Sequence, residues 1–250
     1  MTQGQVTSTG VFVADDFREN LIIDRYDTSL LSMRGAKTAS MRSENSEDVL
    51  TWNVFRSLAQ VDPAIWFPRL FARSFGSSVP SARLIGLQLW KSIEAPPGLR
   101  LVQRDEGESE IDVLIESETF VWVVEAKYRS DVSERTTNNA ERDQVLRNID
   151  VGSWHAGVRD FYFSLLVCDS ATSPKGAALV QHYSQSRGDM LQRLPHRTDG
   201  LNNLKGIGYV RWSDCAGVLR ECAECATHED ERQVASKAVA WLQGKGIGPS

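Results

Sequence analysis

The sequence has few of the features that mark membrane or secreted proteins. It contains no apolar run of roughly 18 residues, the length that a membrane-spanning helix requires, so we expect no membrane span. Its first residues, MTQGQVTSTGVF, lack a basic stretch followed by an apolar one, so we expect no signal peptide. Cysteines are few, and we expect them to be reduced thiols of a cytoplasmic protein; they are Cys168, Cys215, Cys222 and Cys225.

An excess of positive charge is also missing. The formal net charge is −5 and the isoelectric point is about 5.5. This balance argues against a histone-like protein that coats nucleic acid through general phosphate contacts. It does not exclude a nuclease, because a nuclease site needs acidic metal ligands and its basic residues need only cluster on one face.

What is present fits a globular protein. The chain has 250 residues, of which 41% are hydrophobic and 24% charged, so it can bury a sizeable core without disulfides. The pattern of elements predicts an α/β or α+β fold with a mixed central β-sheet flanked by helices. We expect residues 43–245 to form the main domain, and residues 1–42 to be an N-terminal extension of uncertain structure.

The sequence contains recognisable helix and strand signals along its length. Ser46 followed by two acidic residues predicts a helix over 46–61, and Pro63 opens a second. VFVADD and NLIIDRYDTSLL resemble short strands or an edge extension. Further strands are expected over 81–90, as a pair within 110–128, and over 161–169 and 208–214. Further helices are expected from about Asn139 to 152, over 174–194 with a possible break at Gly188, and as one or two helices over 215–243.

The segment EIDVLIESETFVWVVEAKY predicts two strands joined by a tight turn. Alternate side chains of a strand share a face, so Glu125 and Lys127 lie on one face of the second strand. A turn at Glu118–Thr119 pairs Asp112 directly with Glu125, whereas a turn at Ser117–Glu118 leaves them diagonal. Either register places the two carboxylates and the lysine on one face.

Two adjacent carboxylates in an apolar strand pair repel each other unless a cation lies between them. Oxygen ligands suit Mg²⁺ or Mn²⁺, which can activate water and orient a phosphate. Lys127 can then stabilise charge on the phosphate or help position the attacking water. The alternative is an exposed hairpin with a surface Glu125–Lys127 pair, but the apolar strand and the acidic Asp112 on its neighbour favour a site.

Asp112 followed by Glu125-Ala126-Lys127 resembles the PD-(D/E)XK, or restriction-endonuclease-like, nuclease superfamily. The order of elements over roughly 44–220 is similar as well, although Ile111 stands where the nominal motif has proline. The resemblance implies a restriction-endonuclease-like core. It also implies a metal-dependent nuclease that hydrolyses phosphodiester bonds, as a DNA endonuclease of the restriction, resolvase or defence-effector type.

The resemblance adds two further site residues. Glu47, at the start of the first helix, matches a glutamate that completes the metal site in many members, although it also suits the helix dipole. Gln144 matches a glutamine near the lysine or the scissile phosphate, although it also fits a solvated helix face. Further candidates are Glu44 and Glu110 as ligands, and Arg142 and Arg147 as phosphate contacts.

Other interpretations remain open. Cys215, Cys222, Cys225 and His228 could suggest zinc, but their helical setting favours small buried cysteines. A non-catalytic nucleic-acid-binding or assembly module with the same fold is the alternative function, and an α/β interaction protein with a chance Glu-x-Lys is a third. Cleavage of duplex DNA would favour a homodimer, because two strands need two symmetric sites.

Overall fold

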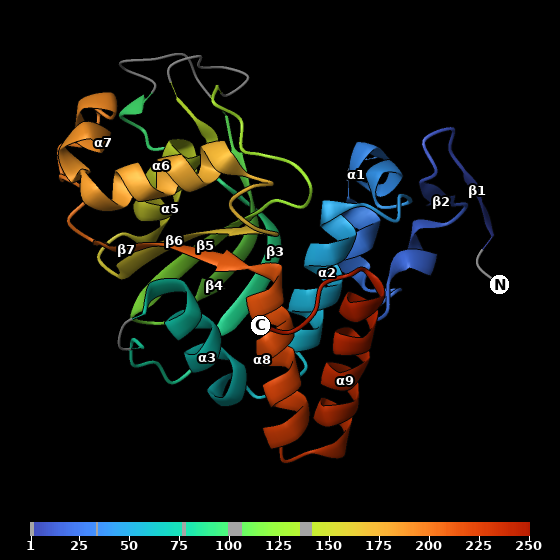
Figure 1. The fold of residues 1–250 in the computed structure, drawn as a ribbon. Coiled ribbons are helices and arrows are strands. Elements are labelled where there is room, and N and C mark those ends of the chain that lie inside the picture. Colours follow the sequence, from blue (N-terminus) through green and yellow to red (C-terminus); the bar gives the residue numbers. More distant parts are fainter. Residues whose placement is uncertain (1–2, 34, 77–78, 100–106, 136–141) are drawn as a thin grey trace. The chain divides into compact units, whose positions relative to one another are not determined.

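The chain folds into two compact units, each described separately here. The computed structural model describes residues 3–33, 35–76, 79–99, 107–135 and 142–250 (Figure 1). One unit consists of Met1–Arg69 with Ser213–Ser250, and the other of Leu70–Trp212. These units do not divide near residue 43, where the sequence suggested a boundary, and the nuclease-like assignment of 43–245 stays a prediction.

The unit Leu70–Trp212 contains a five-stranded mixed sheet in the order β3-β4-β5-β6-β7. The strands are β3 (Gly86–Ile93), β4 (Ser109–Glu116), β5 (Phe120–Ala126), β6 (Asp160–Val167) and β7 (Leu204–Arg211). The first three pair antiparallel, whereas β6 runs parallel to β5 and β7 parallel to β6. The predicted mixed central sheet flanked by helices is therefore confirmed.

Helices cover both faces of this sheet (Figure 1). They are α5 (Gln144–Ala156), α6 (Pro174–Gln185), α7 (Arg187–Arg193) and the last residues of α3 (Pro63–Phe75). Gly152 of α5 lies so close to the sheet that an added Cβ would stand 2.6 Å from the Phe161 ring. On the opposite face, Trp122 makes edge contacts with Phe71 and Phe75 of α3. The central strand β5 is thus buried along its whole length, as its continuous apolar run requires.

The β4–β5 hairpin has the first of the two predicted registers. Glu116 pairs with Val121, and the Ser117 N–H donates to the Phe120 carbonyl at 2.9 Å. The turn therefore consists of Glu118–Thr119. A two-residue turn preserves strand parity, so side chains at alternate positions keep to one face along the whole hairpin.

The other unit combines short N-terminal elements with longer helices from both ends of the chain. Its elements are β1 (Gly4–Val6), β2 (Phe12–Ala14), the 3₁₀ helices η1 (Phe17–Asn20) and η2 (Thr28–Ser32), α1 (Gly35–Ser40), α2 (Glu47–Leu58), α9 (Glu229–Gly244), α8 (Trp212–Cys225) from Ser213 on, and the first part of α3. The helix predicted after Ser46 is confirmed as α2, because the Ser46 hydroxyl accepts the Val49 N–H at 3.3 Å.

The expectation of short strands is confirmed for VFVADD, which contains β2, and is wrong for NLIIDRYDTSLL. Aspartates at the starts of η1 and η2 cap the backbone: Asp16 accepts the Arg18 N–H, and Asp27 accepts the Ser29 N–H at 2.9 Å. A short side chain that bonds the backbone two residues on stabilises a turn in place of an extended strand. Leu21–Ile23 therefore lie in an irregular segment with a bend, and Leu30 and Leu31 lie in η2.

Several element boundaries differ from the prediction. The strand expected over 81–90 is β3, displaced toward the C-terminus. The helix expected over 174–194 breaks at Ser186 and not at Gly188. The C-terminal region forms two helices, and α5 begins at Gln144; the expected start at Asn139 lies outside the described residues.

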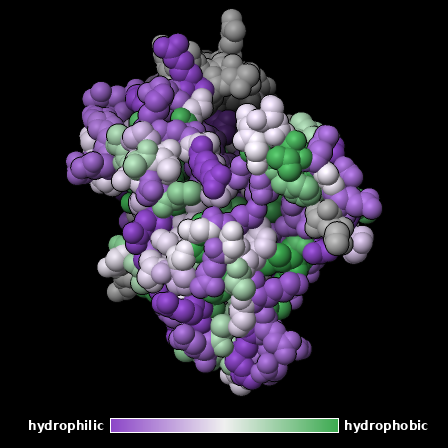
Figure 2. All heavy atoms as spheres, turned by 45° about the vertical axis from the view of Figure 1, so that its right-hand side comes forward, coloured by the Kyte–Doolittle hydropathy of each residue, from purple (hydrophilic) through white to green (hydrophobic). Residues whose placement is uncertain are grey.

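Among the helices of the described residues, none combines the length and the apolar character that crossing a membrane requires. Hydrophilic side chains are interspersed with smaller hydrophobic areas on the face drawn in Figure 2. Single exposed apolar residues such as Tyr26 and Val158 are normal on a protein surface.

Candidate functional site

Asp112 and Glu125 occupy facing positions on β4 and β5. The last backbone pair of the hairpin is Val113 with Val124, so the next positions outward are 112 and 125. The Asp112 carboxylate reaches across to β5, where Oδ2 accepts the Ala126 N–H at 2.9 Å. The side chain of Asp112 thus continues the contact between the strands beyond their paired segment.

Glu125 is a buried carboxylate, with only 3% of its side chain exposed. Its Oε1 atom accepts hydrogen bonds from Lys127 Nζ at 2.7 Å and from Gln144 Nε2 at 2.5 Å. Its Oε2 atom accepts a hydrogen bond from Asn148 Nδ2. A buried carboxylate is costly unless charge and hydrogen bonds offset the loss of water, and these donors supply both.

Lys127 follows β5 directly and is fixed at its backbone and its side chain. Its N–H donates to the Leu166 carbonyl at 2.7 Å, and its carbonyl accepts the Trp212 indole N–H at 2.9 Å. Its Nζ also donates to the Ala126 carbonyl at 3.0 Å. The ammonium group is therefore held beside Glu125 with 10% of the side chain exposed.

Gln144 joins these residues from the first position of α5. Asp143 caps the helix by accepting the Leu146 N–H at 2.8 Å, which fixes where α5 begins. The Gln144 side chain donates to Glu125, and its Oε1 accepts the Ser133 N–H at 3.2 Å. The structure therefore gathers Glu125, Lys127 and Gln144 into one hydrogen-bonded group, next to the Asp112 position.

Asn148 belongs to the same group, and sequence reasoning did not identify it. It is fully buried and lies four residues after Gln144, one turn further along the same face of α5. That spacing was a signal in the sequence, because polar residues at positions i and i+4 of an otherwise apolar helix face share one environment.

The donor set suits a hard divalent cation. Asp112 and Glu125 offer carboxylate oxygens, and Mg²⁺ is commonly held by one or two carboxylates together with water and substrate phosphate. Within the described ranges, no group of three or more His, Cys, Asp and Glu side chains could hold a metal ion. A cation at this place would therefore have two protein carboxylates, those of Asp112 and Glu125, and would take its other ligands from water or substrate.

The remaining acidic candidates lie elsewhere. Glu47 is the first residue of α2, in the unit Met1–Arg69 with Ser213–Ser250, and its role stays a prediction. Glu44 belongs to the same unit, where its carboxylate accepts the Phe12 N–H at 2.7 Å. Glu110 is exposed on β4, paired with Ser92 of β3.

Arg142 does not meet the expectation of a phosphate contact. It is fully buried, and its guanidinium donates to Asp150 at 2.8 Å. His196 Nε2 lies 2.8 Å from the same carboxylate, and Arg197 donates to it at 3.0 Å. Burial opposes ionisation of Asp150, but the hydrogen bond from His196 and the charges of Arg142 and Arg197 prevail and lower its pKa. Arg147 is half-buried on α5.

The cysteines largely follow the prediction of buried thiols. Cys215 and Cys222 are fully buried on α8, whereas Cys225 is exposed and Cys168 is half-buried. All four are free thiols. Burial raises the pKa of Cys222 to about 12, so its thiol stays protonated and unreactive at neutral pH.

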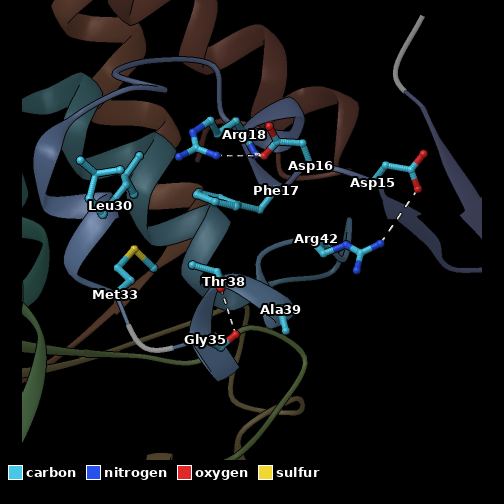
Figure 3. A pocket seen from close by; sticks show the side chains of 11 residues that line it. Asp15, Asp16, Phe17, Arg18, Leu30, Met33, Gly35, Thr38, Ala39 and Arg42 are labelled. Atoms are coloured by element: carbon cyan, nitrogen blue, oxygen red, sulfur yellow. Dashed lines mark hydrogen bonds and ion pairs between the residues drawn. The ribbon is translucent and has the colours of Figure 1, made fainter.

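A cavity of about 460 Å³ lies in the N-terminal part of the chain (Figure 3). Phe17 and Leu30 give it apolar walls, and Arg18 and Arg42 are among its lining residues, with the Arg42 side chain directed toward Asp15. Asp16 pairs with Arg18 at 3.4 Å, so charges of both signs line the cavity. Of the described residues that line it, none is a predicted site residue.

Comparison of the chain with family models, with curated proteins and with solved structures gives no match. A function for the chain is therefore inferred from the residues of the site themselves.

Proposed function

We propose that this protein is a metal-dependent nuclease that hydrolyses phosphodiester bonds, with DNA as its substrate and Mg²⁺ or Mn²⁺ as its cofactor. The observation that carries the proposal is the juxtaposition of Asp112 and Glu125 on facing strand positions, with Lys127 Nζ 2.7 Å from Glu125. The same residues support membership of the PD-(D/E)XK superfamily. The hairpin followed by helix, strand, helices and strand also agrees with that proposal.

The chemistry assigns a role to each residue. Asp112 and Glu125 would hold the cation, which supplies charge neutralisation at the phosphate and an activated water when it is bound. Lys127 carries a fixed positive charge that can donate a hydrogen bond to a phosphate oxygen as negative charge builds there. Gln144 holds Glu125 in place from α5 and also bonds the backbone at Ser133.

The test is cleavage of DNA by the full chain with Mg²⁺, with and without EDTA. We expect cleavage that EDTA stops, and a loss of at least about 10²-fold for Glu125→Gln, since this variant removes the charge of a metal ligand. Glu118→Gln is the matched control, because Glu118 lies at the exposed turn of the same hairpin. Equal activity of wild type and Glu125→Gln would contradict the proposal.

The competing function is a non-catalytic nucleic-acid-binding or assembly module with this fold. The presence of both carboxylates and the lysine favours catalysis, because a binding module has no need of an adjacent acidic pair. If the protein binds DNA but cleaves it neither with Mg²⁺ nor with Mn²⁺, the binding-module function would be favoured over the nuclease.

A homodimer would place two such sites on a duplex, one for each strand. Light scattering of the protein mixed with a DNA duplex and Ca²⁺, an oxygen-binding cation, measures how many protomers bind one duplex. Two protomers per duplex would support endonuclease action of the restriction or resolvase type.

A further inference from the structure

Asn148 is a buried polar residue whose environment needs an explanation beyond helix packing. It is 0% exposed on α5, among apolar neighbours that include Val145 and Ile149. A buried amide costs free energy unless it is hydrogen-bonded. Its Nδ2 donates to Glu125 Oε2, on the strand that carries the proposed metal ligand.

The two oxygens of Glu125 have different surroundings. Oε1 accepts from Lys127 and from Gln144, which matches the two acceptor positions of a carboxylate oxygen. Among the described residues, Oε2 receives a single hydrogen bond, from Asn148. One acceptor position of Oε2 is therefore left for a ligand, while the neutral amide fixes how the carboxylate is turned.

We propose that Asn148 is a positioning residue that holds Glu125 Oε2 ready for a divalent cation. The amide suits this role because it donates without adding positive charge, so it does not oppose the cation as a second lysine would. Residues that orient metal ligands in this way set metal affinity, and their loss commonly weakens it about 10–100-fold. The inference rests on the proposed function, since it needs Glu125 to be a metal ligand.

Asn203, in the turn before β7, provides a control because it contacts the same helix. Its amide donates to the carbonyls of Ser153 and Gly157 at 2.8 Å, and its Oδ1 accepts the Ser153 hydroxyl. Asn203 therefore steadies the C-terminal end of α5 without contacting Glu125. If Asn148 merely steadied α5 as well, both asparagines would influence metal binding in the same way.

The experiment is a calorimetric titration of the full chain with Mn²⁺ alone, accompanied by thermal unfolding. The variants are Asn148→Leu, which removes the donor at similar volume, and Asn203→Ala. We expect Asn148→Leu to bind Mn²⁺ about 10–100-fold more weakly, and Asn203→Ala to bind as wild type does. If Asn148→Leu fails to fold, Asn148→Ser replaces it with the same expectation, because a serine hydroxyl is too short to reach Glu125.

Two results would overturn the inference, and they are distinguishable from failure of the proposed function. Wild-type affinity in the Asn148 variant, or equal weakening in Asn203→Ala, would show that Asn148 does not position Glu125, while the nuclease proposal would stand. Absence of Mn²⁺ binding by the wild type, together with absence of DNA cleavage, would overturn both.

Discussion

The carboxylate of Asp112 has two roles that a single substitution separates. Its Oδ2 atom accepts the Ala126 N–H, which is a structural contact between β4 and β5. Its negative charge, opposite Glu125, is what a cation would require. An asparagine keeps an acceptor oxygen at this position and removes the charge.

We therefore expect Asp112→Asn to fold and to lose metal binding. Its free energy of unfolding should stay within about 1 kcal/mol of the wild type, since the hydrogen bond to Ala126 is retained. Its Mn²⁺ affinity and its DNA cleavage should fall by at least about tenfold. Urea unfolding and calorimetry measure the two effects. Unchanged Mn²⁺ affinity would remove Asp112 from the site.

The site residues differ in how far the sequence could predict them. Strand parity and a short turn place Asp112, Glu125 and Lys127 on one face, because both operate within one hairpin. Asn148 was missed although its spacing from Gln144 was a signal, because the contact with Glu125 itself depends on how α5 packs on the sheet. Arg142 was misjudged for the same reason, since its partner Asp150 and the residues around it come together only in the fold.

At the scale of elements, the position of α5 decides whether its polar residues reach Glu125. Gly152 allows the helix to approach the sheet closely: an added Cβ would lie 2.6 Å from Phe161 and 2.9 Å from Val123. Gly188 in α7 offers a contrast, because an added Cβ there meets nothing within 4 Å.

The two glycines should respond to alanine with opposite signs. Gly152→Ala should lower the free energy of unfolding by about 1–3 kcal/mol, because the helix must move away from the ring of Phe161. Gly188→Ala should raise it by about 0.4–1 kcal/mol, since alanine restricts the unfolded chain and favours helix. Urea unfolding of both variants is the measurement, and a stabilised Gly152→Ala would contradict the close approach.

The buried Asp150 cluster also holds α5 in place. Asp150→Asn removes the buried carboxylate that Arg142 and Arg197 both contact, so we expect a loss of about 3–5 kcal/mol in the free energy of unfolding. Asp189→Asn is the control, because its side chain is 47% exposed, and it should change the value by less than about 0.5 kcal/mol.

The pH dependence of stability gives the cluster a second signature. The pKa of Asp150 is lowered in the folded chain because the hydrogen bond from His196 and the charges of Arg142 and Arg197 outweigh burial. Its contribution is therefore present above the unfolded pKa of about 3.9 and is lost as the pH falls through the folded pKa. Asp150→Asn should flatten this acid limb in urea unfolding at a series of pH values.

Element types were more predictable than their ends. The apolar strand at Asp160–Val167 and the capped helix after Ser46 follow from local composition, and both are confirmed. The segment NLIIDRYDTSLL was misassigned because Asp27 caps a 3₁₀ helix among apolar residues that otherwise suggest a strand. Local hydrogen bonds of this kind override hydrophobic pattern where no neighbouring strand is specified.

At the scale of the molecule, the chain brings its proposed chemistry together in one compact unit. Asp112, Glu125, Lys127 and Gln144 all lie within Leu70–Trp212, whereas Glu47 belongs to the other unit. The sequence could not predict that division, because the unit that contains Glu47 joins segments from both ends of the chain through contacts distant in sequence. The proposed catalysis therefore depends on the β4–β5 hairpin and on Lys127, which follows it.

The most direct measurement compares wild type, Lys127→Ala and Lys205→Ala on linear, circular, single-stranded and branched DNA with Mg²⁺. Lys205 is the control because it lies in the same unit and 45% of its side chain is exposed. Its Nζ lies 3.6 Å from Asp160 Oδ1, so it too is a lysine paired with a carboxylate. We predict that wild type and Lys205→Ala cleave at least one of these substrates, and that Lys127→Ala is slower by about 10²–10³-fold while remaining folded. Cleavage by Lys127→Ala at the wild-type rate would contradict the assignment of this site.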